Sequence, residues 1–114
     1  MSKSPKELLD QFNGNMPKLL AMAPEAGRAF VKQLMPAILT DGALDLKQKE
    51  LIALGIAIAS RCDYCIAIHV KKSLEAGATK EEIGDACGVA MLMGGGPALT
   101  YASFVAECVE EFGG

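Results

Sequence analysis

Residues 45–77 read DLKQKELIALGIAIASRCDYCIAIHVKKSLEAG, and this stretch predicts two consecutive helices. Asp45 and Gln48 have the spacing of a capping box, which begins the first helix, and an apolar run then continues to Ala59. The middle of this helix is apolar on every side, which is typical of a buried central helix. The second helix is expected over 62–76, after a break near Ser60, with a glycine at position 77 as its stop signal.

The rest of the chain carries helix signals of the same kind and no sustained alternation of apolar and polar residues. We therefore expect a single all-α domain over residues 1–114, a compact bundle of five to seven helices. The further helices expected are one that begins at Ser4, Pro5 and Glu7 and ends near Asn13 and Gly14, one over Pro24–Leu39 that Pro36 kinks or splits, one from the Thr79–Glu82 capping box to about Met93, and one over Ala98–Phe112 after the break at Gly94–Pro97.

Charge and hydropathy exclude several classes of function. The net charge is −3 and no basic block is present, so nucleic-acid binding has little support. The N-terminus lacks the apolar segment of a signal peptide, and the longest aliphatic run, Leu51–Ala59, is too short to cross a bilayer. We expect a soluble cytoplasmic protein that binds no membrane. Because that compartment keeps thiols reduced, a close cysteine pair there indicates catalysis or metal binding.

The chain is also more apolar than a small monomer can easily bury. Apolar residues make up 51% of its 114 positions and charged residues only 22%. A domain of this size buries only about two-thirds of its unfolded surface. Because obligate interfaces resemble a core cut in half, this composition predicts a homo-oligomer.

The chemistry of the chain centres on Cys62, Cys65 and His69, the last being the only histidine. At about 100° per residue, the three side chains fall within an arc of about 60° on one helix face. The reactive form of cysteine is the thiolate, and a nearby imidazole can accept the thiol proton. The second thiol can then resolve a sulfenic acid or mixed disulfide into an internal disulfide. The position near the helix start favours charge on Cys62, whereas the i,i+4 contact with His69 favours Cys65.

Two other interpretations of these residues compete with a redox dithiol. Both cysteines and the histidine can be packing residues, since cysteine is often buried. A zinc site requires a fourth ligand and usually a second cysteine or histidine pair, and the sequence has none at a suitable spacing. Cys87 and Cys108 stand alone on later helices, where we expect them to pack.

Glu50, eleven residues, Cys62-Asp-Tyr-Cys65, three residues and His69 make the pattern E-x11-CxxC-x3-H. With its flanking sequence over about 45–99, this pattern resembles the alkylhydroperoxidase D-like branch of the carboxymuconolactone decarboxylase family. The resemblance implies an all-α fold assembled as a homotrimer or homohexamer, with no metal or organic cofactor. It also implies a peroxidase or thiol–disulfide oxidoreductase with an antioxidant role, whose partners are a peroxide or disulfide substrate and a thiol electron donor.

Matched by position, Cys65 would be the thiol that His69 activates for attack on peroxide, and Cys62 the resolving thiol. Glu50 would complete the proton relay from the preceding helix. Alkylhydroperoxidase D itself has a second histidine between its cysteines, where this chain has Tyr64, so the relay here is shorter or different. Two alternatives are a lyase acting on a lactone, by wider family membership, and a helical oligomer that only senses redox state.

Overall fold

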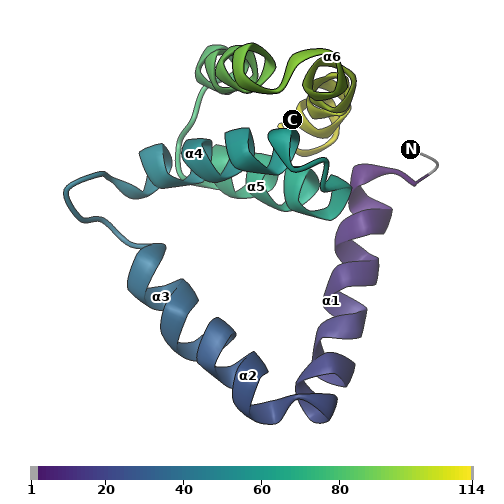
Figure 1. Cartoon of the computed structure of the whole chain (residues 1–114), viewed down its shortest axis with the longest axis vertical. Coiled ribbons are helices and arrows are strands. Elements are labelled where there is room, and N and C mark those ends of the chain that lie inside the picture. Colours follow the sequence, from purple (N-terminus) through teal and green to yellow (C-terminus); the bar gives the residue numbers. More distant parts are fainter. Residues whose placement is uncertain (1–2, 114) are drawn as a thin grey trace.

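The computed structural model describes residues 3–113, and every regular element in that range is helical, which confirms the all-α prediction. Figure 1 shows their arrangement. The elements are α1 (Pro5–Met22), α2 (Pro24–Arg28), a π-helix η1 (Ala29–Leu34), α3 (Met35–Ile38), α4 (Leu46–Ala59), α5 (Asp63–Glu75) and α6 (Lys80–Phe112).

The three capping boxes predicted from the sequence are present, at the starts of α1, α4 and α6. In each of them the side chain of the cap accepts a hydrogen bond from a backbone N–H one turn into the helix, and the acid or amide at that position bonds back to the cap. The pairs are Ser4 with Glu7, Asp45 with Gln48, and Thr79 with Glu82.

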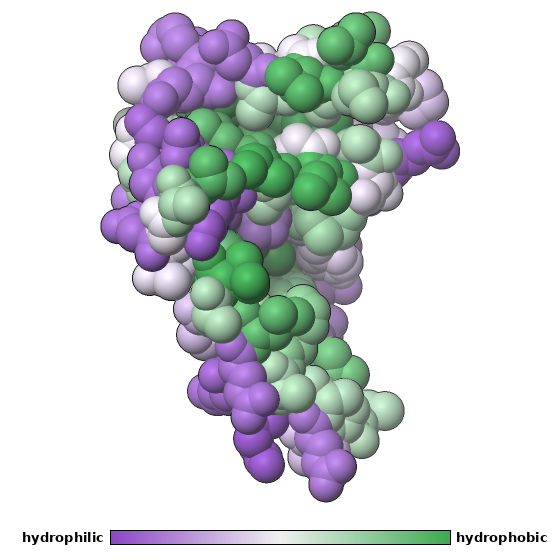
Figure 2. Space-filling model, turned by 60° about the vertical axis from the view of Figure 1, so that its left-hand side comes forward, coloured by the Kyte–Doolittle hydropathy of each residue, from purple (hydrophilic) through white to green (hydrophobic). Residues whose placement is uncertain are grey.

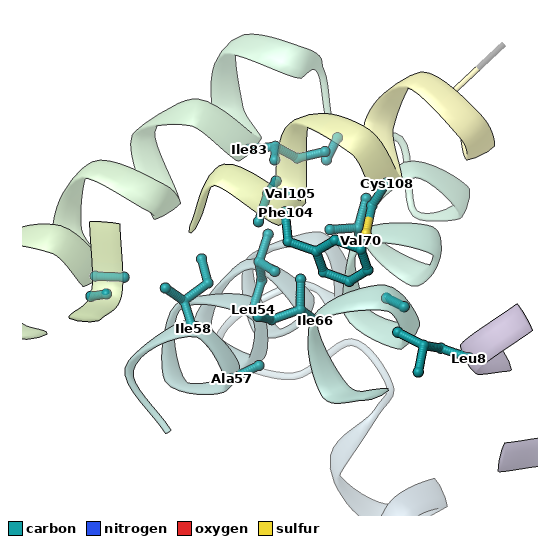
Figure 3. Close-up of a cluster of buried hydrophobic side chains, with 14 residues drawn as sticks. Leu8, Leu54, Ala57, Ile58, Ile66, Val70, Ile83, Phe104, Val105 and Cys108 are labelled. Carbon is teal, nitrogen blue, oxygen red and sulfur yellow. The ribbon is translucent and has the colours of Figure 1, made fainter. Parts of the chain in front are cut away.

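The core lies where α4, α5 and α6 meet (Figure 3). Leu54 and Ile58 of α4 and Ile66 of α5 are fully buried, and Phe104 of α6 packs into the same cluster. Leu8 joins it from α1. Since α4 and α5 follow one another through a short turn, they lie side by side and together hold the residues of the predicted site.

Gly95 divides α6 into two helical halves. Its backbone has φ 69° and ψ −151°, a region that residues with a Cβ rarely adopt, so the break predicted at Gly94–Pro97 is confirmed. By length and composition α6 is the one described helix that would reach across a membrane. The break leaves Lys80–Gly94 and Gly96–Phe112, each shorter than the roughly 20 residues that a bilayer requires.

The predicted end of the first helix was wrong. α1 continues through Asn13, Gly14 and Pro17 to Met22. Glycine and proline lower helix stability in the interior of a helix, but they do not end one when nothing turns the chain away. The backbone at Gly14 keeps a negative φ, unlike that of Gly77, whose φ of 93° ends α5 as predicted.

The prediction that Pro36 kinks or splits its helix was only partly right. Residues 24–38 remain helical throughout, and η1 precedes the proline. The Met35 N–H bonds to the carbonyl of Phe30, five residues back, which is π-helical spacing. The tract therefore changes its hydrogen-bond register ahead of the residue that lacks an N–H.

The segment 24–38, called the arm below, stands away from the core. It packs on α1 and on itself, and within residues 3–113 it has no helix-to-helix packing with α4, α5 or α6. No residue of α2, η1 or α3 is buried. In Figure 1 α1 and the arm form two sides of a triangle, and the α4–α5 layer forms the third.

The prediction that α4 is buried on every side was also wrong for the single chain. Ile52 and Ile56 are 50% and 61% exposed, because α5 and α6 cover only part of the helix and the arm does not pack against it. Figure 2 shows hydrophobic residues gathered across the middle of this face and down the side of the projecting arm.

Candidate functional site

The turn between α4 and α5 places Cys62. The Arg61 N–H bonds to the Ile58 carbonyl and the Cys62 N–H to the Ala57 carbonyl, both at 3.1 Å, which is the pairing of a Schellman motif. The Cys62 carbonyl in turn accepts the Ile66 N–H at 2.9 Å. One residue thus ends the cap of α4 and begins α5, so its position is held by backbone bonds on both sides.

Cys62 and Cys65 are joined by a disulfide at the N-terminus of α5, with their Cα atoms 5.2 Å apart. Cys62 is the N-cap residue, and its sulfur accepts the Cys65 backbone N–H at 3.2 Å. Cysteine here takes the role that serine or aspartate usually has at a helix start. After reduction, the same N–H and the positive end of the helix would stabilise a Cys62 thiolate.

Glu50 and His69 come together across the α4–α5 interface. The Glu50 Oε1 atom lies 2.7 Å from His69 Nδ1. Glu50 is 2% exposed as a residue, whereas the His69 side chain is 23% exposed. A carboxylate can only accept a hydrogen bond, so the proton of the neutral ring lies on Nδ1 and Nε2 carries the lone pair. His69 follows Cys65 by one helical turn, which places the two on the same face of α5.

Tyr64 ties the dithiol turn to α1. Its ring packs against Phe12 with a centroid distance of 6.4 Å, and the residue is partly buried. The Asp63 carboxylate accepts the Tyr64 N–H at 2.8 Å. Both residues therefore support the helix start.

The two remaining cysteines are packing residues, as predicted. Burial raises the pKa of the Cys108 thiol to about 12, with smaller contributions from Glu107 and Glu111. Burial also raises the pKa of the Cys87 thiol. A raised pKa lowers the fraction of thiolate near neutral pH, so Cys62 and Cys65 remain the better candidates for thiol chemistry.

Two features of the site region were not foreseen. Arg61 has φ 58° and is the one non-glycine residue with positive φ among residues 3–113. Ser73, one turn beyond His69, is fully buried, and its hydroxyl has no hydrogen-bond partner in that range. The sequence carries no signal for the positive φ of Arg61, because the usual residue at such a cap is glycine.

Residues 3–113 contain no group of three side chains suited to hold a metal ion.

Comparison with known proteins identifies the family of this chain. The sequence model of the carboxymuconolactone decarboxylase family matches residues 24–107. An uncharacterised protein of Cupriavidus necator is 35% identical over 103 residues, which cover 90% of each chain. Uncharacterized protein 4 in the cox locus of Paracoccus denitrificans is 36% identical, over 88% of this chain and 96% of the relative.

Two solved structures are similar to this fold. The crystal structure of an apo carboxymuconolactone decarboxylase family protein from Legionella pneumophila superposes with a TM-score of 0.90 and 36% identity, over 96% of this chain and 97% of that one. A protein from Thermotoga maritima has a TM-score of 0.65 and 35% identity, over 68% of this chain and 70% of that one.

Proposed function

Because this chain belongs to the carboxymuconolactone decarboxylase family, we propose that it is a thiol-dependent peroxidase and disulfide reductase of the alkylhydroperoxidase D-like branch. One observation carries the proposal: a Cys62–Cys65 pair at a helix start, on the same helix as a histidine that a buried glutamate orients. A lyase of this family has no evident use for such a pair.

The proposed reaction begins at Cys65. His69 Nε2 accepts the thiol proton, and the Cys65 thiolate attacks the terminal oxygen of a hydroperoxide. The O–O bond breaks, Cys65 becomes a sulfenic acid, and the proton held by His69 goes to the departing alkoxide, which leaves as an alcohol. The Cys62 thiolate then attacks the Cys65 sulfur. Hydroxide leaves and is protonated to water, and the disulfide present in the structure is formed.

Glu50 has a positioning role in this scheme. Its bond to Nδ1 keeps the lone pair of the ring on Nε2 and stabilises the imidazolium that forms when Cys65 loses its proton. Burial makes this contact less screened than a surface ion pair would be.

Return to the dithiol requires an electron donor with thiols. One donor thiolate attacks a sulfur of the disulfide, a mixed disulfide forms, and a second donor thiolate releases the reduced protein and an oxidised donor. A cytoplasmic location, which we also propose, would keep such a donor reduced.

Thiol counting tests the proposal. The reduced protein has four cysteine thiols. One equivalent of hydroperoxide should remove two of them, and mass spectrometry should locate a Cys62–Cys65 bond that a dithiol reductant reverses. Four unchanged thiols together with turnover of a lactone carboxylate would support the lyase instead. Oxidation by peroxide without repeated turnover when a donor is supplied would indicate a redox sensor.

Sulfenic acid trapping tests the assignment of the two thiols. In Cys62→Ser, peroxide should leave a sulfenic acid on Cys65 that a dimedone-type reagent captures. In Cys65→Ser, consumption of peroxide should fall to background. Capture on Cys62 in the second variant, with none on Cys65 in the first, would reverse the two roles.

We also propose that the protein assembles as a homo-oligomer through the arm. Phe30, Leu34 and Ile38 of the arm are each half or more exposed and recur every four residues. An apolar groove of about 520 Å³ lies between α4 and α6, with Ile52, Ile56, Val89 and Met93 among its exposed lining residues.

The occupant that fits both surfaces is a second copy of this chain. In such a contact the arm of one copy and the groove of the next together bring on the order of 800 Å² of exposed apolar residue surface, about half of a standard interface, so neighbouring residues would have to contribute the rest. An arm packed into the groove of the next copy is a head-to-tail contact, which forms a closed ring when the rotation between copies allows it.

A further inference from the structure

Arg61 is held in a conformation that its residue type disfavours. It occupies the C′ position of the Schellman motif that ends α4, with φ 58°. Glycine is the usual residue there, because a Cβ crowds the backbone in the left-handed region. A strained residue of this kind lowers stability, and such residues concentrate at functional sites.

The Arg61 side chain forms no contact that explains its presence. The residue is exposed, and within residues 3–113 its guanidinium has neither a carboxylate within 4.0 Å nor a hydrogen-bond partner. The neighbouring Asp63 carboxylate is engaged with the Tyr64 N–H at the start of α5. The positive charge of Arg61 therefore faces solvent without a partner.

This charge is one residue away from Cys62, the thiol that the proposed donor meets. Consecutive Cα atoms are about 3.8 Å apart and an arginine side chain reaches about 7 Å, so the rotamers that fold towards Cys62 bring the guanidinium within a Debye length of about 8–10 Å of its sulfur. Cys62 is held by backbone bonds on both sides, so the distance varies only with the Arg61 side chain.

We infer that Arg61 selects thiol and disulfide partners that carry carboxylates near the reacting sulfur. The inference rests on the proposed exchange chemistry at Cys62 and names the chemical class of its electron donor. A donor thiolate with such a carboxylate attacks the Cys62 sulfur, and the Cys62–Cys65 bond breaks. Cys65 leaves as a thiolate and takes the proton that His69 Nε2 accepted when the donor thiol ionised. A second donor thiolate then attacks the donor sulfur of the mixed disulfide, which releases the Cys62 thiolate and an oxidised donor.

The test uses the reverse half of this exchange, with Cys62 as the attacking thiol. In the Cys65→Ser/Cys87→Ser background, Cys62 is the one remaining thiol that is not fully buried. Its reaction with a dianionic aromatic disulfide, dithiobis(nitrobenzoate), is compared by stopped flow with that of uncharged dithiodipyridine. Both rates depend on the same fraction of thiolate, so a change in their ratio between variants reports the charge that each reagent meets.

In this background Arg61→Gln should lower the rate ratio of anionic to neutral reagent by about three- to tenfold at low salt. The difference should shrink at 1 M salt, and Arg61→Lys should keep most of the wild-type ratio. Lys71→Gln, which removes the same charge more than two turns along α5, is the matched control and should leave the ratio unchanged. Equal ratios in wild type and Arg61→Gln would overturn the inference.

Arg61→Gly separates the charge from the backbone. It should lower the rate ratio as Arg61→Gln does, while raising the thermal midpoint by about 2–6 °C through relief of the strained φ. A raised midpoint with an unchanged ratio would mean that Arg61 has no role in partner choice. Because synthetic disulfides are used, the result does not depend on whether the protein reduces peroxide, so each proposal fails on its own measurement.

Discussion

At the scale of single residues, the site depends on one contact between two helices. The bond between Glu50 Oε1 and His69 Nδ1 joins α4 to α5 and leaves the lone pair of the neutral ring on Nε2. Backbone bonds hold Cys62 on both sides, whereas in the proposed reaction the activation of Cys65 depends on the Glu50–His69 contact. Changes at Glu50 should therefore affect Cys65 far more than Cys62.

Glu50→Gln keeps the size of the side chain and its capacity to hydrogen-bond but removes its negative charge. We expect the alkylation rate of Cys65 in the reduced Cys62→Ser background to fall about 10²-fold near pH 7 and to recover partly at high pH, where the thiol ionises unaided. Glu75→Gln, which changes an exposed carboxylate on α5, is the control and should behave like the parent. Superimposable pH profiles for Glu50→Gln and the parent would rule out the relay.

Ser73 offers a test of stability at the same scale. Its hydroxyl is fully buried without a hydrogen-bond partner in residues 3–113. Burial of an unpaired polar group is unfavourable, so Ser73→Ala should raise the free energy of unfolding by about 1 kcal/mol in a denaturant titration. Ser103→Ala, at an exposed hydroxyl that donates to the Thr100 carbonyl, is the comparison and should change it by less than about 0.5 kcal/mol. A marked loss of stability in Ser73→Ala would show that this hydroxyl has a structural role.

At the scale of elements, the break in α6 decides how the C-terminal half packs. The halves meet at Gly95, whose φ of 69° and ψ of −151° are open to glycine. Phe104, Val105 and Cys108 of the second half reach the core only because the chain turns there. The break is therefore a condition for the α4–α5 layer to be covered.

Gly95→Ala should lower the free energy of unfolding by about 1–3 kcal/mol, because a Cβ is unfavourable at this φ and ψ. No neighbouring atom lies within 4 Å of the added Cβ, so the loss would come from backbone conformation and not from a clash. Gly96→Ala also meets no neighbour, lacks the positive φ, and should be neutral or stabilising by up to about 1 kcal/mol. Equal effects of the two substitutions would contradict this account.

At the scale of the whole molecule, the single chain leaves its arm and the α4–α6 groove without a partner. The arm contains no buried residue, although it runs for fifteen positions between α1 and the loop before α4. Helical segments this short are not stable alone in water. The composition predicted an oligomer, and the structure shows which surfaces are available to form one.

Sedimentation at micromolar concentration should give a trimer or hexamer of the 12.0 kDa chain. A charge placed in either proposed surface, by Leu34→Glu in the arm or Ile56→Glu in the groove, should shift the protein towards monomer. Leu44→Glu, at an exposed apolar residue outside both surfaces, should leave the oligomer intact. A monomeric wild type would refute the assembly proposal, and an oligomer that survives both substitutions would place the interface elsewhere.

Local signals in the sequence were enough to determine the helical class, the three capping boxes, the stop at Gly77 and the break before Pro97. Each of these depends on residues within one or two turns of one another. Glu50 joined Cys62, Cys65 and His69 as one candidate set through the resemblance of the E-x11-CxxC-x3-H pattern to a known family, and a short turn between α4 and α5 brings Glu50 and His69 together.

Only the tertiary structure decided the rest, because it depends on contacts between residues far apart in the chain. The folded chain extends α1 past Asn13, Gly14 and Pro17, and it leaves the arm without helix packing against α4, α5 or α6. It exposed one face of α4, whose composition alone predicts complete burial, and it placed Arg61 at a cap where glycine is usual. Local sequence sets the helix propensity of a segment, whereas the burial of its side chains and the strain of its backbone depend on the other segments that pack around it.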